Sequence, residues 1–291
     1  MARPLVIFVH GVFIWEPDWW WQHVAALLDE CEIDSCTVQL PSTGWEAPLG
    51  DLHDDAAAVR RAIDEAEGPV ILIGHSYGGM VITEAAFRHP KVVHLVYMSA
   101  FVPDGTSAVM AELTNPADVE AFETEVGGSG VKSWVLSHTL SIGGGAPTAL
   151  MLKWLVGGGL RARIATALVG LTAGDGYITN GEGGSKSYIL EELEDPELVQ
   201  GSLRRLARQS VSSAIQKPAG EAWKEIPSTF MLILHDVDVS VQRQMRHAAR
   251  CTNVVEVPTN HFAHLERPEL VRDVLVDIAN HACEHTYSKA R

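Results

Sequence analysis

Short runs of consecutive apolar residues alternate with amphipathic segments in the first third of the chain. Such runs are typical of strands that are covered on both faces. They lie at residues 5–9, 37–41, 70–73 and 92–98. The clearest segment between them begins after Asp51, a capping residue, and repeats its apolar positions at helical spacing as far as Ala66. Strands that alternate with helices in this way predict an α/β fold with a mostly parallel sheet flanked by helices.

This alternation stops after Pro103 and resumes near Pro227. Between them, residues 104–226 contain glycine clusters separated by helical segments, and no strand is expected there. We interpret 104–226 as an inserted, mostly helical cap (lid), and residues 1–103 with 227–291 as the core. In the second part of the core, strands are expected at 230–235 and 253–258. Two helices should follow these strands and face the sheet with the apolar positions Val241, Met245 and Ala248, and Leu270, Val271, Val274, Leu275 and Ile278.

Composition narrows the class of protein. The 291 residues include 46% hydrophobic residues and carry a net charge of −15, which makes nucleic acids and anionic membranes poor partners. No apolar run approaches the length of a membrane span or resembles a secretory leader, so a cytoplasmic protein is expected. The four cysteines lack the spacing of a zinc site, and no cofactor is expected. Both a monomer and a homodimer remain open.

The stretch "VILIGHSYGGMVI" places a serine between two apolar runs. Gly74 and Gly78 bracket Ser76 as G-x-S-x-G, between an expected strand and an expected helix. This context is typical of a sharp strand-to-helix turn that exposes a serine nucleophile. The backbone N–H of Tyr77, at the start of the helix, would face a developing oxyanion. We therefore interpret Ser76 as a nucleophile.

A serine hydroxyl needs a base, and the segment "VPTNHFAHLERPEL" offers His261 and His264 after the last strand. His261 is favoured because it lies closer to the strand end. The base in turn needs a carboxylate, and "LILHDVDVS" offers Asp236 directly after a strand, with Asp238 as the alternative acid. Asp104 is a further, weaker candidate acid.

The second oxyanion donor is expected in the loop "HGVF" after the first strand. Gly11 would let this loop approach the site, and the N–H of Val12 is favoured over that of Phe13. His10 is expected to support the loop by hydrogen bonding, without acting as a base.

The motifs "FVHGVF", "GHSYGGMV" and "SAFVPDG", with the late Asp and His, resemble the α/β-hydrolase superfamily, and within it the esterase and hydroxynitrile-lyase branch. The resemblance covers residues 4–103 and 227–283. It implies Ser76, Asp236 and His261 as a catalytic triad, with Val12 and Tyr77 as backbone donors. The first two strands usual in the superfamily have no counterpart here, and the sequence around the acid departs from the common G-x-x-D motif.

These residues predict a serine esterase that cleaves a small-molecule carboxylic ester, or a lactone or thioester, through an acyl-enzyme. Lyase chemistry is disfavoured because Phe262 stands where such lyases carry a lysine, and Gly11 and Val12 follow the loop histidine where those lyases have a threonine. Perhydrolase chemistry and a non-catalytic binding scaffold remain alternatives.

Tryptophans predict the kind of substrate. They cluster after the HG loop and recur in and beside the expected cap, which indicates an apolar or aromatic substrate if they line a pocket, and a packed interior otherwise. They are Trp15, Trp19, Trp20, Trp21, Trp134, Trp154 and Trp223. The pair His281 and His285 has metal-like spacing near the C-terminus, but it is interpreted as a solvated helix end and no metal is expected.

Overall fold

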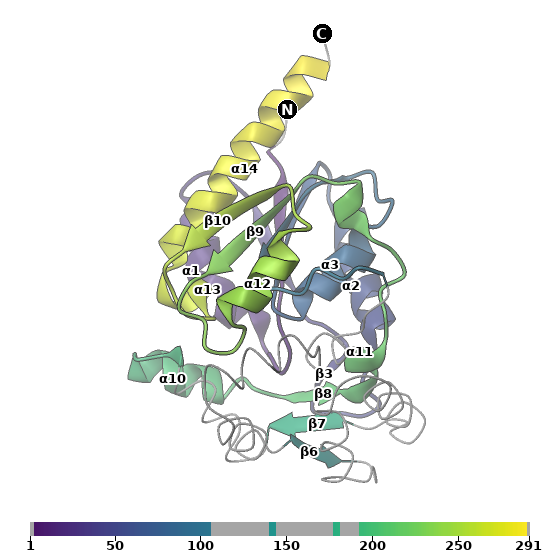
Figure 1. The fold of residues 1–291 in the computed structure, drawn as a ribbon, viewed down its shortest axis with the longest axis vertical. Coiled ribbons are helices and arrows are strands. Elements are labelled where there is room, and N and C mark those ends of the chain that lie inside the picture. The colour runs from purple at the N-terminus through teal and green to yellow at the C-terminus, as the bar shows by residue number, and fades with distance from the viewer. Residues whose placement is uncertain (1–2, 106–139, 144–176, 181–191, 290–291) are drawn as a thin grey trace.

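The computed structural model describes residues 3–105, 140–143, 177–180 and 192–289. Six strands form one sheet in which each neighbouring pair is parallel, in the order β10-β9-β5-β4-β1-β2 (Figure 1). Their bounds are β1 Leu5–Val9, β2 Ser35–Val38, β4 Val70–His75, β5 Val92–Met98, β9 Ser228–Ile233 and β10 Asn253–Val257. The predicted parallel sheet is thereby confirmed.

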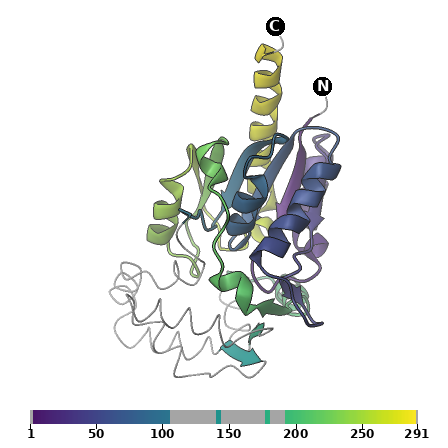
Figure 2. The ribbon, with the colours of Figure 1, turned by 90° about the vertical axis from the view of Figure 1, so that its right-hand side faces the viewer.

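Helices cover both faces of this sheet (Figure 2). One face carries α1 Pro17–Asp29, α13 Ala263–Glu266 and α14 Pro268–Lys289, and the other carries α2 Leu52–Glu65, α3 Gly78–Ala86 and α12 Val241–Ala248. Successive side chains of a strand point to opposite faces, so β1 contributes Val6 and Phe8 to one core and Ile7 and Val9 to the other. This explains why the strands read as continuous apolar runs.

The predicted start of α2 is confirmed. The Asp51 side chain accepts hydrogen bonds from the N–H groups of His53 and Asp54, and the Asp54 side chain accepts one from the Asp51 N–H. This reciprocal pair satisfies backbone donors that a helix start leaves without intrahelical partners. α2 then packs along α3 and helps to fix the helix that follows Ser76.

The order of the strands reverses beside β1. From β1 the chain moves outward to β2 and then returns to the other side of β1 to form β4. Open parallel sheets bind their ligands at such a switch point, in the crevice at the carboxyl ends of the strands. Here those ends are followed by Gly11 and Ser76.

A second, antiparallel sheet has the order β3-β8-β7-β6 and lies beyond the carboxyl ends of the main strands (Figures 1 and 2). Its strands are β3 Thr43–Gly44, β6 Leu140–Gly143, β7 Tyr177–Asn180 and β8 Arg208–Ser210. No strand was expected in 104–226 from the sequence, and for β6, β7 and β8 this expectation was wrong. Each of these strands has only three or four residues and pairs with segments far away in sequence, so no local pattern marks them.

The described part of 104–226 also contains α10 Pro196–Leu203, α11 Val211–Ile215 and the short 3₁₀ helix η1 Ala222–Lys224. The helical segments expected around 146–156 and 160–171 lie outside the described residues. The boundaries of the cap therefore stay a prediction. Within the described residues, no helix is long and apolar enough to cross a membrane.

Two local expectations need correction. The second expected strand, 37–41, is found earlier, as β2. In α12, Met245 is 58% exposed, and the inner face is formed by Gln244, His247 and Ala248. Gln244 is buried because its side chain bonds to the N–H and C=O of Ile233 and to the C=O of Val239, at distances of 2.8 Å.

Candidate active site

Ser76 occupies the turn between β4 and α3 in a strained backbone conformation. Its φ angle is 53°, in the left-handed region that residues other than glycine seldom adopt. The surrounding chain holds it there: the Ser76 N–H donates to Met98 O at 3.2 Å, and the Ser76 C=O accepts from the N–H groups of Gly79 and Phe101 at 3.1 Å. The expected strand–serine–helix turn is therefore present.

The two motif glycines allow the backbone to close around this turn. A Cβ added to Gly74 would lie 2.6 Å from the carbonyl oxygen of Gly78, and one added to Gly78 would lie 2.5 Å from that of Val9. Real Cβ atoms do not approach backbone oxygens this closely. The missing side chain of Gly74 lets the end of β4 lie against the start of α3, and that of Gly78 lets α3 lie against β1.

The loop that follows β1 contacts the turn directly. A Cβ added to Gly11 would lie 3.2 Å from Ser76 Cβ, so this loop passes beside the serine, as the sequence analysis expected. The N–H of Phe13, the alternative oxyanion donor, donates to Gln209 Oε1 at 3.1 Å and thus already has an acceptor. Tyr77 caps α3 with its backbone, while its hydroxyl donates to Asp55 Oδ2 at 2.7 Å on the far side. The roles of the Val12 and Tyr77 N–H groups remain predictions.

His10 has the supporting place expected for it. Its Nδ1 lies 2.7 Å from Gly11 O, and its Nε2 accepts from the N–H of Leu40 at 3.1 Å. Burial lowers the pKa of the imidazole to about 4, although the hydrogen bond to Gly11 opposes this shift. A neutral His10 therefore fixes the loop between β1 and α1.

His261 and Asp236 form a hydrogen-bonded pair inside the protein. His261 Nδ1 lies 2.7 Å from Asp236 Oδ2, and both side chains are fully buried. Asp236 is held in turn by the N–H groups of Asp238 (2.9 Å) and Val239 (2.7 Å) and by the hydroxyl of Ser99. These donors fix the orientation of the carboxylate toward the imidazole.

Asp238, the alternative acid, lies on the other side of the imidazole. Its Oδ2 is 3.9 Å from His261 Nε2, whereas Asp236 contacts Nδ1. Of the two aspartates, Asp236 is the one within hydrogen-bond distance of the imidazole, and its part as the acid stays a prediction. Asp104, the third candidate, is paired at the surface with Arg250 at 3.6 Å.

His75 connects the imidazole of His261 to the serine turn. The residue directly before Ser76 places its Nε2 3.0 Å from His261 O, and the two rings have their centroids 4.4 Å apart. Burial, followed by the charges of His261 and His264, lowers the pKa of His75 well below its usual value. The neutral His75 ring thus joins the base loop to the nucleophile turn.

The pKa of His261 reflects opposing effects. Complete burial would lower it, but the charge of Asp236 and the hydrogen bond to it, with the charges of Asp238 and Glu192, together raise the pKa to about 9. His264, the alternative base, is also fully buried and stacks on Trp21 at 4.4 Å, and burial lowers its pKa to about 3. His264 therefore packs in the core against Trp21, and its ring lies 4.9 Å from that of His75.

The tryptophans have mixed locations. Trp20 and Trp21 are fully buried, and Trp21 stacks on Phe8 at 4.6 Å, so these two belong to the core beside β1. Trp223 donates to Pro103 O at 2.7 Å, and Arg205 lies over the ring of Trp19. Trp134 and Trp154 fall outside the described residues. For Trp20 and Trp21 the packed interior, one of the two interpretations of the tryptophans, is therefore the one observed, because α1 turns both rings toward the sheet.

Besides His75, Ser99 and Glu192 contribute to the site without having been predicted from the sequence. Ser99 directly follows β5 with φ 41° and donates to Asp236. Glu192 is only 4% exposed and accepts hydrogen bonds from the backbone of both the Asp236 loop and the His261 loop. Ser99 could have been named as a candidate from the sequence, because it is a polar residue directly after an apolar strand. Glu192 lies within the acidic run "EELEDPEL", which by itself looks like a solvated surface.

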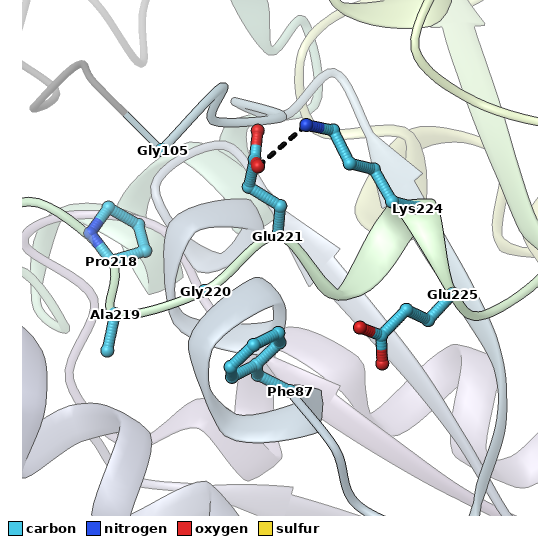
Figure 3. A pocket seen from close by; sticks show the side chains of 8 residues that line it. All are labelled: Phe87, Gly105, Pro218, Ala219, Gly220, Glu221, Lys224 and Glu225. Atoms are coloured by element: carbon cyan, nitrogen blue, oxygen red, sulfur yellow. Dashed lines mark hydrogen bonds and ion pairs between the residues drawn. The ribbon is translucent and has the colours of Figure 1, made fainter.

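A separate hollow of about 400 Å³ lies at the far end of α3 (Figure 3). Its lining comes from Phe87, which directly follows α3, from Gly105, from residues 218–221 and from Lys224 and Glu225, and an ion pair of 2.7 Å joins Glu221 and Lys224. None of the residues around Ser76 belongs to this lining. The hollow is therefore distinct from the candidate active site.

The fold and this arrangement define the class. A parallel sheet carries a strained serine on a strand-to-helix turn, followed along the chain by an aspartate and a histidine that pair with each other. A sequence profile of the Alpha/beta hydrolase family matches residues 6–274, and the chain belongs to this family.

Curated relatives and solved structures agree with this assignment. An alpha/beta hydrolase of Aspergillus novofumigatus is 25% identical over 301 aligned residues, covering 98% of this chain and 100% of that protein. A pyrethroid hydrolase of Sphingobium wenxiniae is 26% identical over 261 residues (86% and 77%), and a carbendazim-hydrolysing esterase of Nocardioides sp. is 36% identical over 128 residues (42% and 52%). The crystal structure of polyneuridine aldehyde esterase shares the fold, with a TM-score of 0.69 at 16% identity over 95% of this chain and 99% of that one. The chain is thus a hydrolase, and its relatives include esterases.

Proposed function

We propose that this protein is a serine hydrolase that cleaves a carboxylic ester through an acyl-enzyme intermediate. The observation that carries the proposal is the buried His261–Asp236 pair, which His75 joins to the strained Ser76 turn. The names of two relatives, an esterase and a pyrethroid hydrolase, support hydrolysis of an ester. Lactones and thioesters would react by the same acyl transfer.

In the proposed mechanism, His261 Nε2 takes the proton of the Ser76 hydroxyl as its oxygen attacks the ester carbonyl. Asp236 holds the Nδ1 proton and stabilises the imidazolium that forms. The N–H groups of Val12 and Tyr77 bind the oxyanion. The alcohol then leaves with the proton from His261, and water attacks the acyl-enzyme by the same steps to release the acid and restore Ser76.

The substrate class that we propose is an ester of a small apolar or aromatic molecule. The support is indirect: two relatives are named for action on carbendazim and on pyrethroids. A series of nitrophenyl esters of increasing acyl length tests this proposal, with faster turnover expected for larger apolar acyl groups than for acetate. Equal kcat/KM along the series would contradict the substrate class and leave the serine mechanism intact.

The mechanism is tested by treating the folded protein with a fluorophosphonate and mapping the labelled peptide by mass spectrometry. Wild type should be labelled at Ser76 and should hydrolyse nitrophenyl esters, while Ser76→Ala should do neither. Ser212→Ala, in α11, is the matched control and should behave as wild type. If Ser76 of the folded wild type stays unlabelled and no ester is cleaved, the proposed function is wrong.

A further inference from the structure

Glu192 is a buried carboxylate that contacts both loops of the proposed acid–base pair. Its Oε1 accepts a hydrogen bond from the N–H of Val237 at 3.0 Å, and its Oε2 accepts one from the N–H of His261 at 2.9 Å. Its own carbonyl oxygen accepts from the side-chain amide of Asn260. Glu192 therefore forms hydrogen bonds to Val237, the residue after Asp236, and to His261 itself. It also accepts one from Asn260, the residue before His261.

These bonds begin where the sheet ends. The last ladder pair of β9 and β10 is Ile233 with Val257. Two more backbone bonds continue past it, from the Leu234 N–H to Val257 O and from the His235 N–H to Thr259 O, both at 3.0 Å. Beyond these bonds the two loops diverge, and the carboxylate of Glu192 bonds to both of them. It thus connects the loops after β9 and β10, as backbone pairing connects the two strands themselves.

The segment that carries Glu192 is anchored in the core. Leu193 is 4% exposed and Val199, in α10, is 6% exposed, and both belong to the apolar cluster on the α1 and α14 face of the sheet. Because its neighbours are fixed in this way, Glu192 can hold the two loops against a rigid support.

Burial of the Glu192 carboxylate disfavours its charged form, which would not happen to a glutamate at the surface. Burial raises its pKa to about 7, the nearby charge of Asp236 adds to this, and the charge of His261 opposes it. The other groups that face His261 are Asp236 and Asp238 from the loop after β9, His75 from β4 and His264 from α13. Glu192 thus adds a third carboxylate to one imidazole, which calls for a functional explanation.

We propose that Glu192 is a positioning residue of this active site: its two carboxylate oxygens hold the Asp236 loop and the His261 loop in the register that keeps the acid and the base paired. This inference rests on the proposed function. It assigns to the cap segment a direct part in aligning the acid–base pair, separate from any contact with substrate. A misplacement of about 1 Å at a reacting group lowers turnover by about 10²-fold, so loss of this clamp should reduce kcat more than it changes KM.

Three variants, Glu192→Gln, Glu192→Asp and Glu194→Gln, test the proposal. Glu192→Gln keeps the size but presents an amide NH₂ to one of the two N–H donors, and we expect kcat to fall by about 10- to 100-fold with little change in KM. It also removes a negative charge that raises the pKa of His261, so the pH at which kcat/KM is half-maximal should decrease. Glu194→Gln changes an exposed glutamate of the same segment and should leave kcat and the pH profile as in wild type.

Glu192→Asp distinguishes the effect of the carboxylate's position from the effect of its charge. It is also the second variant that tests the proposal if Glu192→Gln does not fold. The shorter side chain keeps the charge but cannot span both N–H groups, so kcat should fall while the half-maximal pH stays near that of wild type. Fluorophosphonate labelling of wild type at Ser76 establishes that the proposed function holds. If wild type is active and both folded Glu192 variants have the kcat of Glu194→Gln, the inference about Glu192 is wrong while the proposed function stands.

Discussion

His261 Nδ1 lies 2.7 Å from Asp236 Oδ2, in an interior where neither side chain is exposed to solvent. The two residues are 25 positions apart and are brought together because β9 and β10 are neighbours with the same direction. Parallel strands deliver their carboxyl ends to one edge of the sheet, and the loops that follow can pair there.

This pairing predicts different effects for the two candidate acids. Asp236→Asn should lower kcat for ester hydrolysis by about 10⁴-fold, because an amide favours the wrong tautomer of His261. Asp238→Asn should retain most of the activity, since Asp238 lies near Nε2 and does not contact Nδ1. Steady-state kinetics on one nitrophenyl ester compares the two variants. A larger loss for Asp238→Asn would transfer the role of acid to Asp238.

The raised pKa of His261 predicts an alkaline pH profile. Only the neutral imidazole can accept the proton of Ser76, so kcat/KM should rise with pH and reach half its maximum near pH 9. Asp238→Asn removes a negative charge that raises this pKa, and its half-maximal pH should therefore be lower. Glu30→Gln, at the exposed end of α1, is the control that should not shift the profile. A shift to higher pH in Asp238→Asn would contradict the assigned electrostatics.

The close approach at Gly78 predicts a stability effect. Gly78→Ala would place a methyl group 2.5 Å from Val9 O and 2.9 Å from His10 O, and the backbone of the elbow must move to accept it. We expect the free energy of unfolding to fall by about 1–3 kcal/mol. In the control Gly44→Ala, the nearest atom is 3.3 Å away in the flexible side chain of Leu49, so the loss should be smaller. Urea denaturation measures both, and equal stabilities would contradict the tight packing.

The hydrogen bonds of Gln209, a residue of β8, link the second sheet to the HG loop and predict an effect on stability and activity. Its side-chain oxygen accepts from the Phe13 N–H at 3.1 Å and from the Thr43 hydroxyl at 2.7 Å. Gln209→Ala leaves the buried Thr43 hydroxyl and the partly buried Phe13 N–H without this acceptor, which should cost about 1–3 kcal/mol of unfolding free energy. Because Phe13 directly follows Val12, kcat should fall as well.

Gln200→Ala, at an exposed position of α10, is the matched control for this substitution. Thermal unfolding and ester kinetics on both variants complete the comparison. If Gln209→Ala matches Gln200→Ala in both measurements, Gln209 does not support the loop.

Much of the fold could be predicted because its signals are local. The apolar run of β5 and the cap of α2 at Asp51 were identified at their observed bounds, and the strand–serine–helix context of Ser76 is visible within thirteen residues. The candidates after β9 and β10 could be named from their places at the strand ends. The sequence favours Asp236 but keeps Asp238 as an alternative, since the two aspartates lie only two positions apart after the same strand.

What could not be predicted depends on contacts between distant segments. Glu192 is buried because its carboxylate satisfies two backbone N–H groups 45 and 69 residues away, and nothing in an acidic run reveals such partners. Gln244 replaced Met245 on the inner face of α12 for a similar reason, because its amide completes hydrogen bonds at the end of β9. In both cases the position of a polar residue is decided by the backbone groups around it, and its hydrophobicity gives no guide.

The direction of α14 has a practical consequence. This helix of 22 residues leads away from the edge that carries Ser76, and the C-terminus lies at the opposite pole of the protein from the second sheet (Figure 1). A resin, a surface or a fluorescent fusion partner coupled at the C-terminal end would therefore sit remote from incoming substrate. Immobilised in this orientation, the protein would present the edge that carries Ser76 to the flowing solution.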